Sequence, residues 1–114
     1  MAISTREIPP SEWKGYFDDF SRDLPRLRAT VEVTGKDVGA QVEAERPLLT
    51  GITYDDGDDI LVIGLDAPGG LAEDLEHIVY QPQKIYVAEE DEMTVFDVED
   101  SEQHQTLLRL EPTS

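Results

Sequence analysis

The spacing of apolar residues changes once along this 114-residue chain, and this change constrains the fold more than any other feature. Ahead of Pro25, large apolar side chains recur every three or four residues, at Trp13, Tyr16, Phe17, Phe20 and Leu24. That spacing aligns them on one side of an α-helix, so it predicts an amphipathic helix over residues 10–23. From Leu27 onward, apolar residues alternate with polar ones, which is the period of a β-strand with one wet face.

Prolines mark both ends of the predicted helix. Pro9 and Pro10 suit a first helical turn, where the missing N–H group costs nothing. Pro25 disfavours helical backbone at the residue before it, which ends the helix. The aromatic residues of the helix are expected to belong to the core, because burying each large ring is worth about 2–3 kcal/mol.

About seven or eight short strands are predicted between residues 27 and 110. Their expected spans are 27–34, 40–44, 48–54, 60–65, 75–80, 84–88, 94–98 and 106–110. Glycine-containing segments at 35–37 and 67–70 are expected as a turn and a loop. Residues 60–65 are apolar on both sides, so this strand is expected at the centre of the sheet with both faces covered.

These elements predict an α+β fold in a single domain over residues 1–114. The N-terminal amphipathic helix is expected to pack on a curled antiparallel β meander. A partly open small barrel is the favoured form, and its layout loosely resembles that of small Sm-like and SH3-like barrels. A flatter sheet with the helix on one face is the alternative. Architecture of this kind does not by itself indicate a function.

The chain is strongly acidic, with 26 Asp and Glu residues against nine Lys and Arg residues and a formal net charge of -17. Residues 58–114 carry 15 acids and only two bases, Lys84 and Arg109, so -13 of that charge lies there. Such a field repels nucleic-acid phosphates and anionic lipid headgroups. We therefore expect no nucleic-acid partner and no membrane partner. A basic protein surface is one candidate partner, and a cation site or mimicry of nucleic acid are the alternatives.

Adaptation to a salt-rich cytoplasm, which requires no partner, is the favoured explanation of the acidity. Only three of the nine bases are Lys, and Asp is as frequent as Glu, a composition that suits halophilic adaptation. We predict that the melting temperature rises steadily as KCl is raised toward molar concentration, because screening relieves the self-repulsion of the chain. Calorimetric scans across a KCl series measure this, and a constant or falling melting temperature would contradict it.

Other classes of protein are excluded by what the sequence lacks. The chain has no cysteine, which removes disulfides, thiolate metal sites and a cysteine nucleophile. Its first residues lack the apolar run of a signal peptide, and no apolar stretch is long enough to span a membrane. A soluble, cytoplasmic protein is therefore expected.

The segment 55–59 is the first candidate for a metal site. It places Asp55, Asp56, Asp58 and Asp59 around a glycine, and carboxylate oxygens are the ligands that Ca²⁺ and Mg²⁺ prefer. The spacing is not that of an EF-hand, which needs a Glu six residues after the glycine, where this chain has Ile63. A solvated β-turn is the favoured interpretation, since Asp and Gly are typical of tight turns.

The chain has two histidines, His77 and His104. His77 follows Glu76 in a predicted strand and could act as a base or a metal ligand, although a partly buried strand residue is the favoured interpretation. The sequence contains no phosphate-binding glycine loop and no serine-nucleophile motif. We therefore assign no catalytic residue, cofactor or cofactor-binding residue, and the weak metal candidates are Asp55, Asp56, Asp58, Asp59 and His77.

Two functions are consistent with these features. The favoured one is a small acidic binding or interaction module with no catalysis of its own. The alternative is a metal-dependent minor enzyme or regulator that uses the 55–59 turn and His77. The acidic segments 55–59, 89–92 and 99–102 are all expected at turns, and they would form a negative pole if the hairpins align at one end of the sheet.

Several short stretches resemble a known family of sequences. They are Arg6–Glu7–Ile8–Pro9, Glu12–Trp13, Phe17–Phe20, Val38–Ala44, Leu49–Asp55, Leu75–Glu76–His77, Pro82 and Ile85–Tyr86–Val87. Together they make the chain similar to uncharacterised bacterial proteins grouped as domain-of-unknown-function family 5335, from about Arg6 to Leu110. The resemblance implies a small stand-alone cytoplasmic protein and supplies no activity, cofactor or site.

Overall fold

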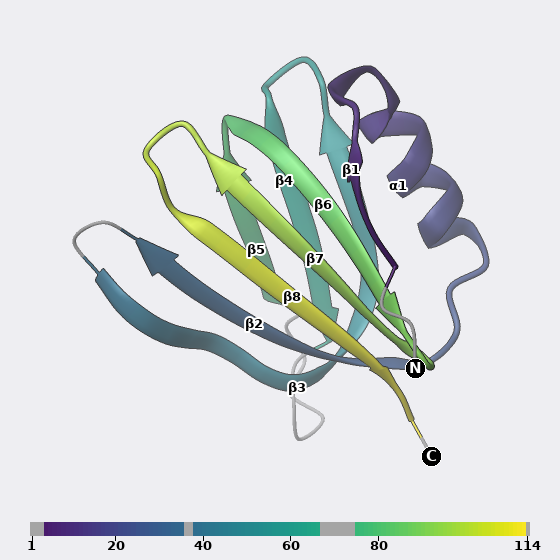
Figure 1. Ribbon diagram of the computed structural model, residues 1–114. Coiled ribbons are helices and arrows are strands. Elements are labelled where there is room, and N and C mark those ends of the chain that lie inside the picture. Colours follow the sequence, from purple (N-terminus) through teal and green to yellow (C-terminus); the bar gives the residue numbers. More distant parts are fainter. Residues whose placement is uncertain (1–3, 36–37, 67–74, 114) are drawn as a thin grey trace.

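The structure, a computed structural model, describes residues 4–35, 38–66 and 75–113. One helix lies beside an antiparallel sheet of eight strands (Figure 1). The predicted turn at 35–37 and loop at 67–70 fall partly or wholly outside the described residues. The elements are β1 (Ser4–Ile8), a 3₁₀ helix (Pro10–Glu12), α1 (Trp13–Arg22), β2 (Leu27–Gly35), β3 (Val38–Asp55), β4 (Ile60–Asp66), β5 (Leu75–Tyr80), β6 (Pro82–Glu90), β7 (Met93–Asp100) and β8 (Gln105–Pro112).

The predicted helix is confirmed, with a 3₁₀ turn at its start where the prolines stand. A strand that the sequence did not predict, β1, precedes it, so the helix lies between the first two strands. Of the four side chains of β1 whose burial is described, Ile8 is buried, whereas Thr5, Arg6 and Glu7 are exposed. The strand is held by backbone pairing with β6 at the edge of the sheet, and so short a segment has no clear alternation of apolar residues to reveal it.

The strand order is β1-β6-β7-β8-β2-β3-β4-β5. Two consecutive runs, β2 to β5 and β6 to β8, are joined by pairing between β8 and β2. The predicted α+β class with an antiparallel sheet is confirmed. The sheet is not closed, since β1 and β5 form its two edges. The finer prediction of a curled sheet that approaches a barrel stays a prediction.

The sequence placed residues 60–65 at the centre of the sheet, and this was wrong. β4 lies next to the edge strand β5. Leu61, Ile63 and Leu65 are buried, whereas the residues between them are only half-buried, so one face of the strand is covered. The apolar composition of a strand reports how much of it is buried, but the choice of neighbours depends on pairing between distant segments.

The predicted strands at 40–44 and 48–54 are two parts of one long strand, β3. Its first part pairs with β2 and its last part pairs with β4. Pro47 lies between these parts, where the register with β2 shifts from Thr30 opposite Glu45 to Arg28 opposite Leu48. Proline has no N–H group to donate to a ladder, so a bulge of this kind is where a strand tolerates it.

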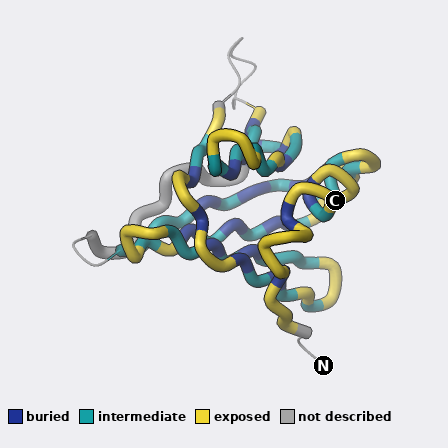
Figure 2. The backbone as a smooth tube through the Cα atoms, turned by 90° about the horizontal axis from the view of Figure 1, so that it is seen from above, coloured by how far each residue is buried: buried dark blue, intermediate teal, exposed yellow. Residues whose placement is uncertain are grey.

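The core lies between α1 and the face of the sheet that the helix covers (Figure 2). Phe96 of β7 is its aromatic centre, with ring centroids 5.3 Å from Phe17, 5.3 Å from Phe20 and 6.1 Å from Tyr16. Buried Trp13 anchors the start of the helix, because its Nε1–H group donates to the carbonyl oxygen of Ile8 at 2.8 Å. Among the described residues, the helices are too short or too polar to cross a bilayer.

Three connections of the chain meet at one end of the sheet. Only Gln81 separates β5 from β6, so the ends of these two strands lie within about 8 Å of each other. The N–H group of Gln81 donates to the carbonyl oxygen of Asp59 at 2.9 Å, and its own carbonyl oxygen accepts from the N–H group of Ser101 at 3.1 Å. The β3–β4 turn, the β5–β6 link and the β7–β8 turn are therefore tied together.

Candidate functional site

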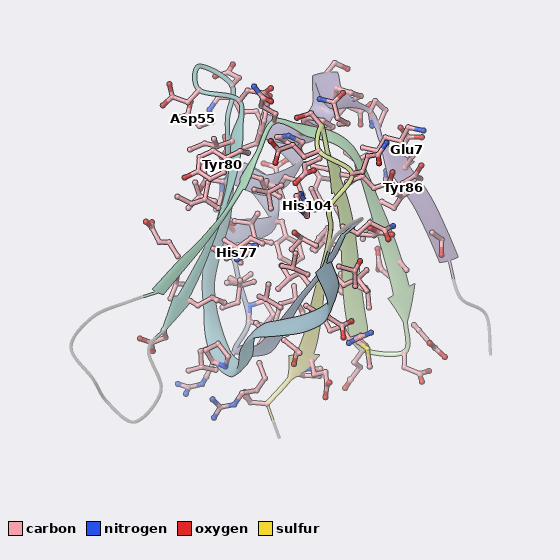
Figure 3. The ribbon with its side chains drawn as sticks, turned by 90° about the vertical axis from the view of Figure 1, so that its left-hand side faces the viewer. Glu7, Asp55, His77, Tyr80, Tyr86 and His104 are labelled. Atoms are coloured by element: carbon pink, nitrogen blue, oxygen red, sulfur yellow. The ribbon has the colours of Figure 1, made fainter. Side chains whose placement is uncertain are left out.

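A cavity of about 360 Å³ lies beside this junction. Val33 and Val79 form part of its apolar wall. Its polar lining comes from β5, the β5–β6 link and the β7–β8 turn, and includes His77, Tyr80, Gln81, Asp100, Ser101, Glu102 and His104. Figure 3 shows His77, Tyr80 and His104 on the same side of the molecule. Both histidines of the chain, 27 residues apart in the sequence, thus line one cavity.

His104 is held in place by the carboxylate of Asp100. Its Nδ1 atom lies 3.4 Å from Oδ2 of Asp100 and 4.0 Å from Oε2 of Glu102. The other oxygen of Asp100, Oδ1, accepts from the backbone N–H groups of Glu102 at 2.8 Å and His104 at 2.9 Å. The Asp100 carboxylate therefore both shapes the turn and orients the imidazole ring. The ring also packs against Gly35 of β2, where a Cβ atom would overlap it.

Ser101 lies in the same turn, but its hydroxyl group donates a hydrogen bond to Gln81 and not to a histidine. Its O–H group donates to Oε1 of Gln81 at 2.8 Å. A serine nucleophile needs its hydroxyl within hydrogen-bond reach of a base, and here the proton is directed to an amide oxygen. The arrangement of Asp100, Ser101 and His104 therefore offers hydrogen-bonding groups to a ligand, not an activated nucleophile.

The acidic turn at 55–59 uses its carboxylates to stabilise itself. Oδ1 of Asp55 accepts from the N–H groups of Gly57 at 2.9 Å and Asp58 at 3.2 Å. The hydroxyl of Tyr54 donates to Oδ1 of Asp59 at 2.7 Å. This hydrogen bond is the largest of the causes that raise the pKa of Tyr54 to about 12, and burial and the nearby carboxylate charges add to it. Such bonds are typical of a solvated turn.

The structure does not bring His77 to this turn. His77 is opposite Ile63 in the β4–β5 register, three residues beyond Ile60, so it lies about 10 Å along the strand from the turn. Asp55 stands at the tip of its hairpin, well away from His77 (Figure 3). Within the described ranges, no three His, Asp or Glu side chains are arranged to hold a metal ion. A metal site at 55–59 with His77 stays a prediction.

Two of the three acidic segments lie at the same end of the sheet. The 55–59 turn and the β7–β8 turn are both tied to Gln81. The 89–92 segment lies at the opposite end, because β6 begins beside Gln81 and runs away from it to a turn at Asp91 and Glu92. A single pole of three clusters, which we predicted if the hairpins aligned, is therefore wrong.

The sequence missed the residues that turned out to surround His77 in this cavity. His104 was noted only as the second histidine, and Asp100 and Ser101 only as parts of an acidic turn. One local signal was present, since an Asp four residues before a His across a tight turn can reach it. That His77 joins them depends on how β5 meets β7, which no local pattern encodes.

The fold and this cavity define a small α+β protein with an acidic, ligand-sized cavity at one end of an open antiparallel sheet. The chain belongs to a family of unknown function, DUF5335, whose model matches residues 4–114. It is also similar to an uncharacterized protein of Aquifex aeolicus (strain VF5), with 38% identity over 111 residues, which cover 96% of this chain and 95% of that protein. The resemblance found in the sequence is thus confirmed. No solved structure matches the chain.

Proposed function

We propose that the protein is a small binding module, without catalysis of its own, that accepts an organic cation in the cavity between His77 and His104. The observation that supports this most directly is the set of groups in the cavity wall. Asp100 and Glu102 contribute carboxylates, and none of the described residues that line the cavity is Lys or Arg. Acceptor groups beside an aliphatic wall suit a ligand with a charged amine and a short alkyl chain.

The size of the cavity supports a small ligand. Its volume of about 360 Å³ is near the lower end of the range for ligand sites, which is about 300–1,000 Å³. The hydrogen bonds of the β7–β8 turn support a site that is formed before a ligand binds. Ser101 bonds to Gln81 through both its hydroxyl and its backbone N–H group, and Asp100 accepts from the backbone of the turn. A preformed site loses little conformational entropy when the ligand binds.

Titration with putrescine, followed by calorimetry and by the NMR signals of the histidine rings, tests this proposal. We expect saturable binding that shifts the signals of both His77 and His104. The Glu102→Gln variant should bind about two- to fivefold more weakly, the size expected for an exposed charge. Glu102 is highly exposed, at 79% of its side chain, so this variant is expected to fold normally.

Two controls isolate the charge in the cavity. The Glu92→Gln variant makes the same change of charge at the exposed turn at the opposite end of the sheet, and it should bind putrescine as the unaltered protein does. The neutral isostere 1,4-butanediol should not bind. Equal binding of butanediol, equal weakening by the two variants, or unmoved histidine signals would each overturn the proposal.

A further inference from the structure

A second groove lies on the face of the sheet opposite to the core. Side chains alternate between the faces of a strand, so Asp97 points away from the helix because its neighbours Phe96 and Val98 are buried beneath it. The groove has a volume of about 360 Å³ and is mostly apolar. Its lining comes from β1, β6, β7 and β8 and comprises Thr5, Tyr86, Ala88, Val95, Asp97 and Leu107.

One carboxylate oxygen in this groove has no partner. Oδ1 of Asp97 is buried, and no hydrogen bond reaches it. Burial raises the pKa of Asp97, and the neighbouring charge of Glu99 raises this pKa further. Buried polar atoms in native proteins are almost always hydrogen-bonded, and an exception calls for an explanation. Asp97 lines the groove, so a rotation of its carboxylate would present this oxygen to an external donor that enters there.

The nearby bases of this face are placed against other acids. Arg109 lies 3.7 Å from Glu32, measured from Nη2 to Oε1. Lys84 is opposite Glu99 in the β6–β7 register, two residues along the strand from Asp97. The missing donor is therefore best supplied by a group from another molecule, and a cation suits it best because Asp97 and Glu99 are both acids.

Acidic and apolar residues alternate in a row across the strands. Glu7 is opposite Tyr86, Tyr86 is opposite Asp97, and Asp97 is opposite Leu107. Glu7 and Tyr86 lie together on one side of the molecule in Figure 3. Neighbouring strands are about 4.8 Å apart, so Glu7 and Asp97 are about 10 Å apart with Tyr86 between them.

This spacing matches one side of an α-helix. Residues i and i+7 of a helix are about 10.5 Å apart on the same side, and residue i+4 lies between them. Basic residues at i and i+7 could thus face Glu7 and Asp97, while apolar residues at i+4 and i+11 would cover Tyr86 and Leu107. We propose that the outer groove docks a basic amphipathic helix of a partner protein, with a Lys or Arg side chain bound to Asp97.

Charge favours this occupant over a second copy of the chain. A face-to-face dimer would bring the acids of two chains together, each with a formal net charge of -17, and like charges across an interface oppose association. A basic helix reverses the sign of that interaction. Its binding should therefore weaken as ionic strength is raised.

A titration with a capped 18-residue helical peptide tests the inference. The peptide carries lysines at i and i+7 and leucines at i+4 and i+11, and in its counterpart glutamine replaces both lysines. We expect the lysine peptide to shift the backbone NMR signals of Tyr86, Asp97 and Leu107, and the glutamine peptide to shift none. The Asp97→Asn variant should bind at least about tenfold more weakly, because it removes the buried partner of the cation.

Two further variants keep the result interpretable. Asp56→Asn makes the same change in an exposed turn and should alter the affinity less than about twofold. Glu7→Gln, at an exposed position, should weaken binding of the lysine peptide about two- to fivefold. If Asp97→Asn fails to fold, this variant tests the proposed groove in its place. Equal binding of both peptides, equal effects of Asp97→Asn and Asp56→Asn, or signal shifts confined to the cavity of His77 and His104 would overturn the inference. Self-association that protects the same residues would assign the groove to a second copy and overturn it too.

Discussion

Replacing Phe96 by alanine is expected to lower the free energy of unfolding by about 3–5 kcal/mol. Phe96 is 1% exposed, and its ring contacts the rings of Tyr16, Phe17 and Phe20. Its removal leaves a cavity between β7 and α1 that the rings of the helix cannot fill without moving. A domain of this size has a total stability of about 5–15 kcal/mol, so the change removes a large part of it.

Urea unfolding followed by tryptophan fluorescence measures this effect, since Trp13 begins the same helix. The control is Tyr80→Ala, which removes another aromatic ring from a side chain that is 65% exposed. That variant should change the free energy of unfolding by no more than about 0.5 kcal/mol. If the two variants were equally destabilised, the helix could not be docked on Phe96 as described.

Replacing Gly35 by alanine is expected to cost about 1–3 kcal/mol of stability and to disturb the cavity. The added Cβ atom would overlap the imidazole ring of His104. That ring is also held by Asp100, with 3.4 Å between Nδ1 and Oδ2, so it cannot move aside without loss of this contact. We expect the NMR signals of His104 to change and the affinity for putrescine to fall.

A second glycine provides a control, because its replacement by alanine is expected to raise the stability and not to lower it. Gly15 lies in α1, and nothing within 4 Å would meet a Cβ atom there. Alanine is favoured over glycine inside a helix by about 0.5–1 kcal/mol, so Gly15→Ala should stabilise the protein and leave putrescine binding unchanged. Thermal unfolding of both variants compares them directly. Stabilisation by both substitutions would show that His104 does not rest on Gly35.

Much of the secondary structure could be predicted because its signals are local. The stripe from Trp13 to Phe20 predicted the helix, since residues three or four apart share one side of it whatever lies nearby. The alternation after Leu27 predicted strands for the same reason, and β5 was predicted at its observed bounds. β1 was missed because a strand of five residues is too short to carry a clear alternation of apolar and polar positions.

Neither candidate site could be predicted in this way. Asp100 and His104 are close in the sequence, but His77 reaches their cavity only because a one-residue link brings the end of β5 back to β6. Asp97 was not singled out in the sequence, because a lone acid in a strand carries no local signal. The burial of its unpartnered oxygen follows from the tertiary structure, in which Tyr86 and Leu107 lie opposite Asp97 on the two neighbouring strands.

The sequence by itself therefore determined the α+β class, the helix, most strands and the strong negative charge. These features depend on side-chain type and on periods of two or 3.6 residues, which act within a few positions of the chain. The tertiary structure alone decided the strand order, the place of β4 beside the edge strand β5, the cavity of His77 and His104 and the environment of Asp97. The physical reason is that each of these depends on contacts between segments far apart in the chain, and such contacts leave no period in the sequence.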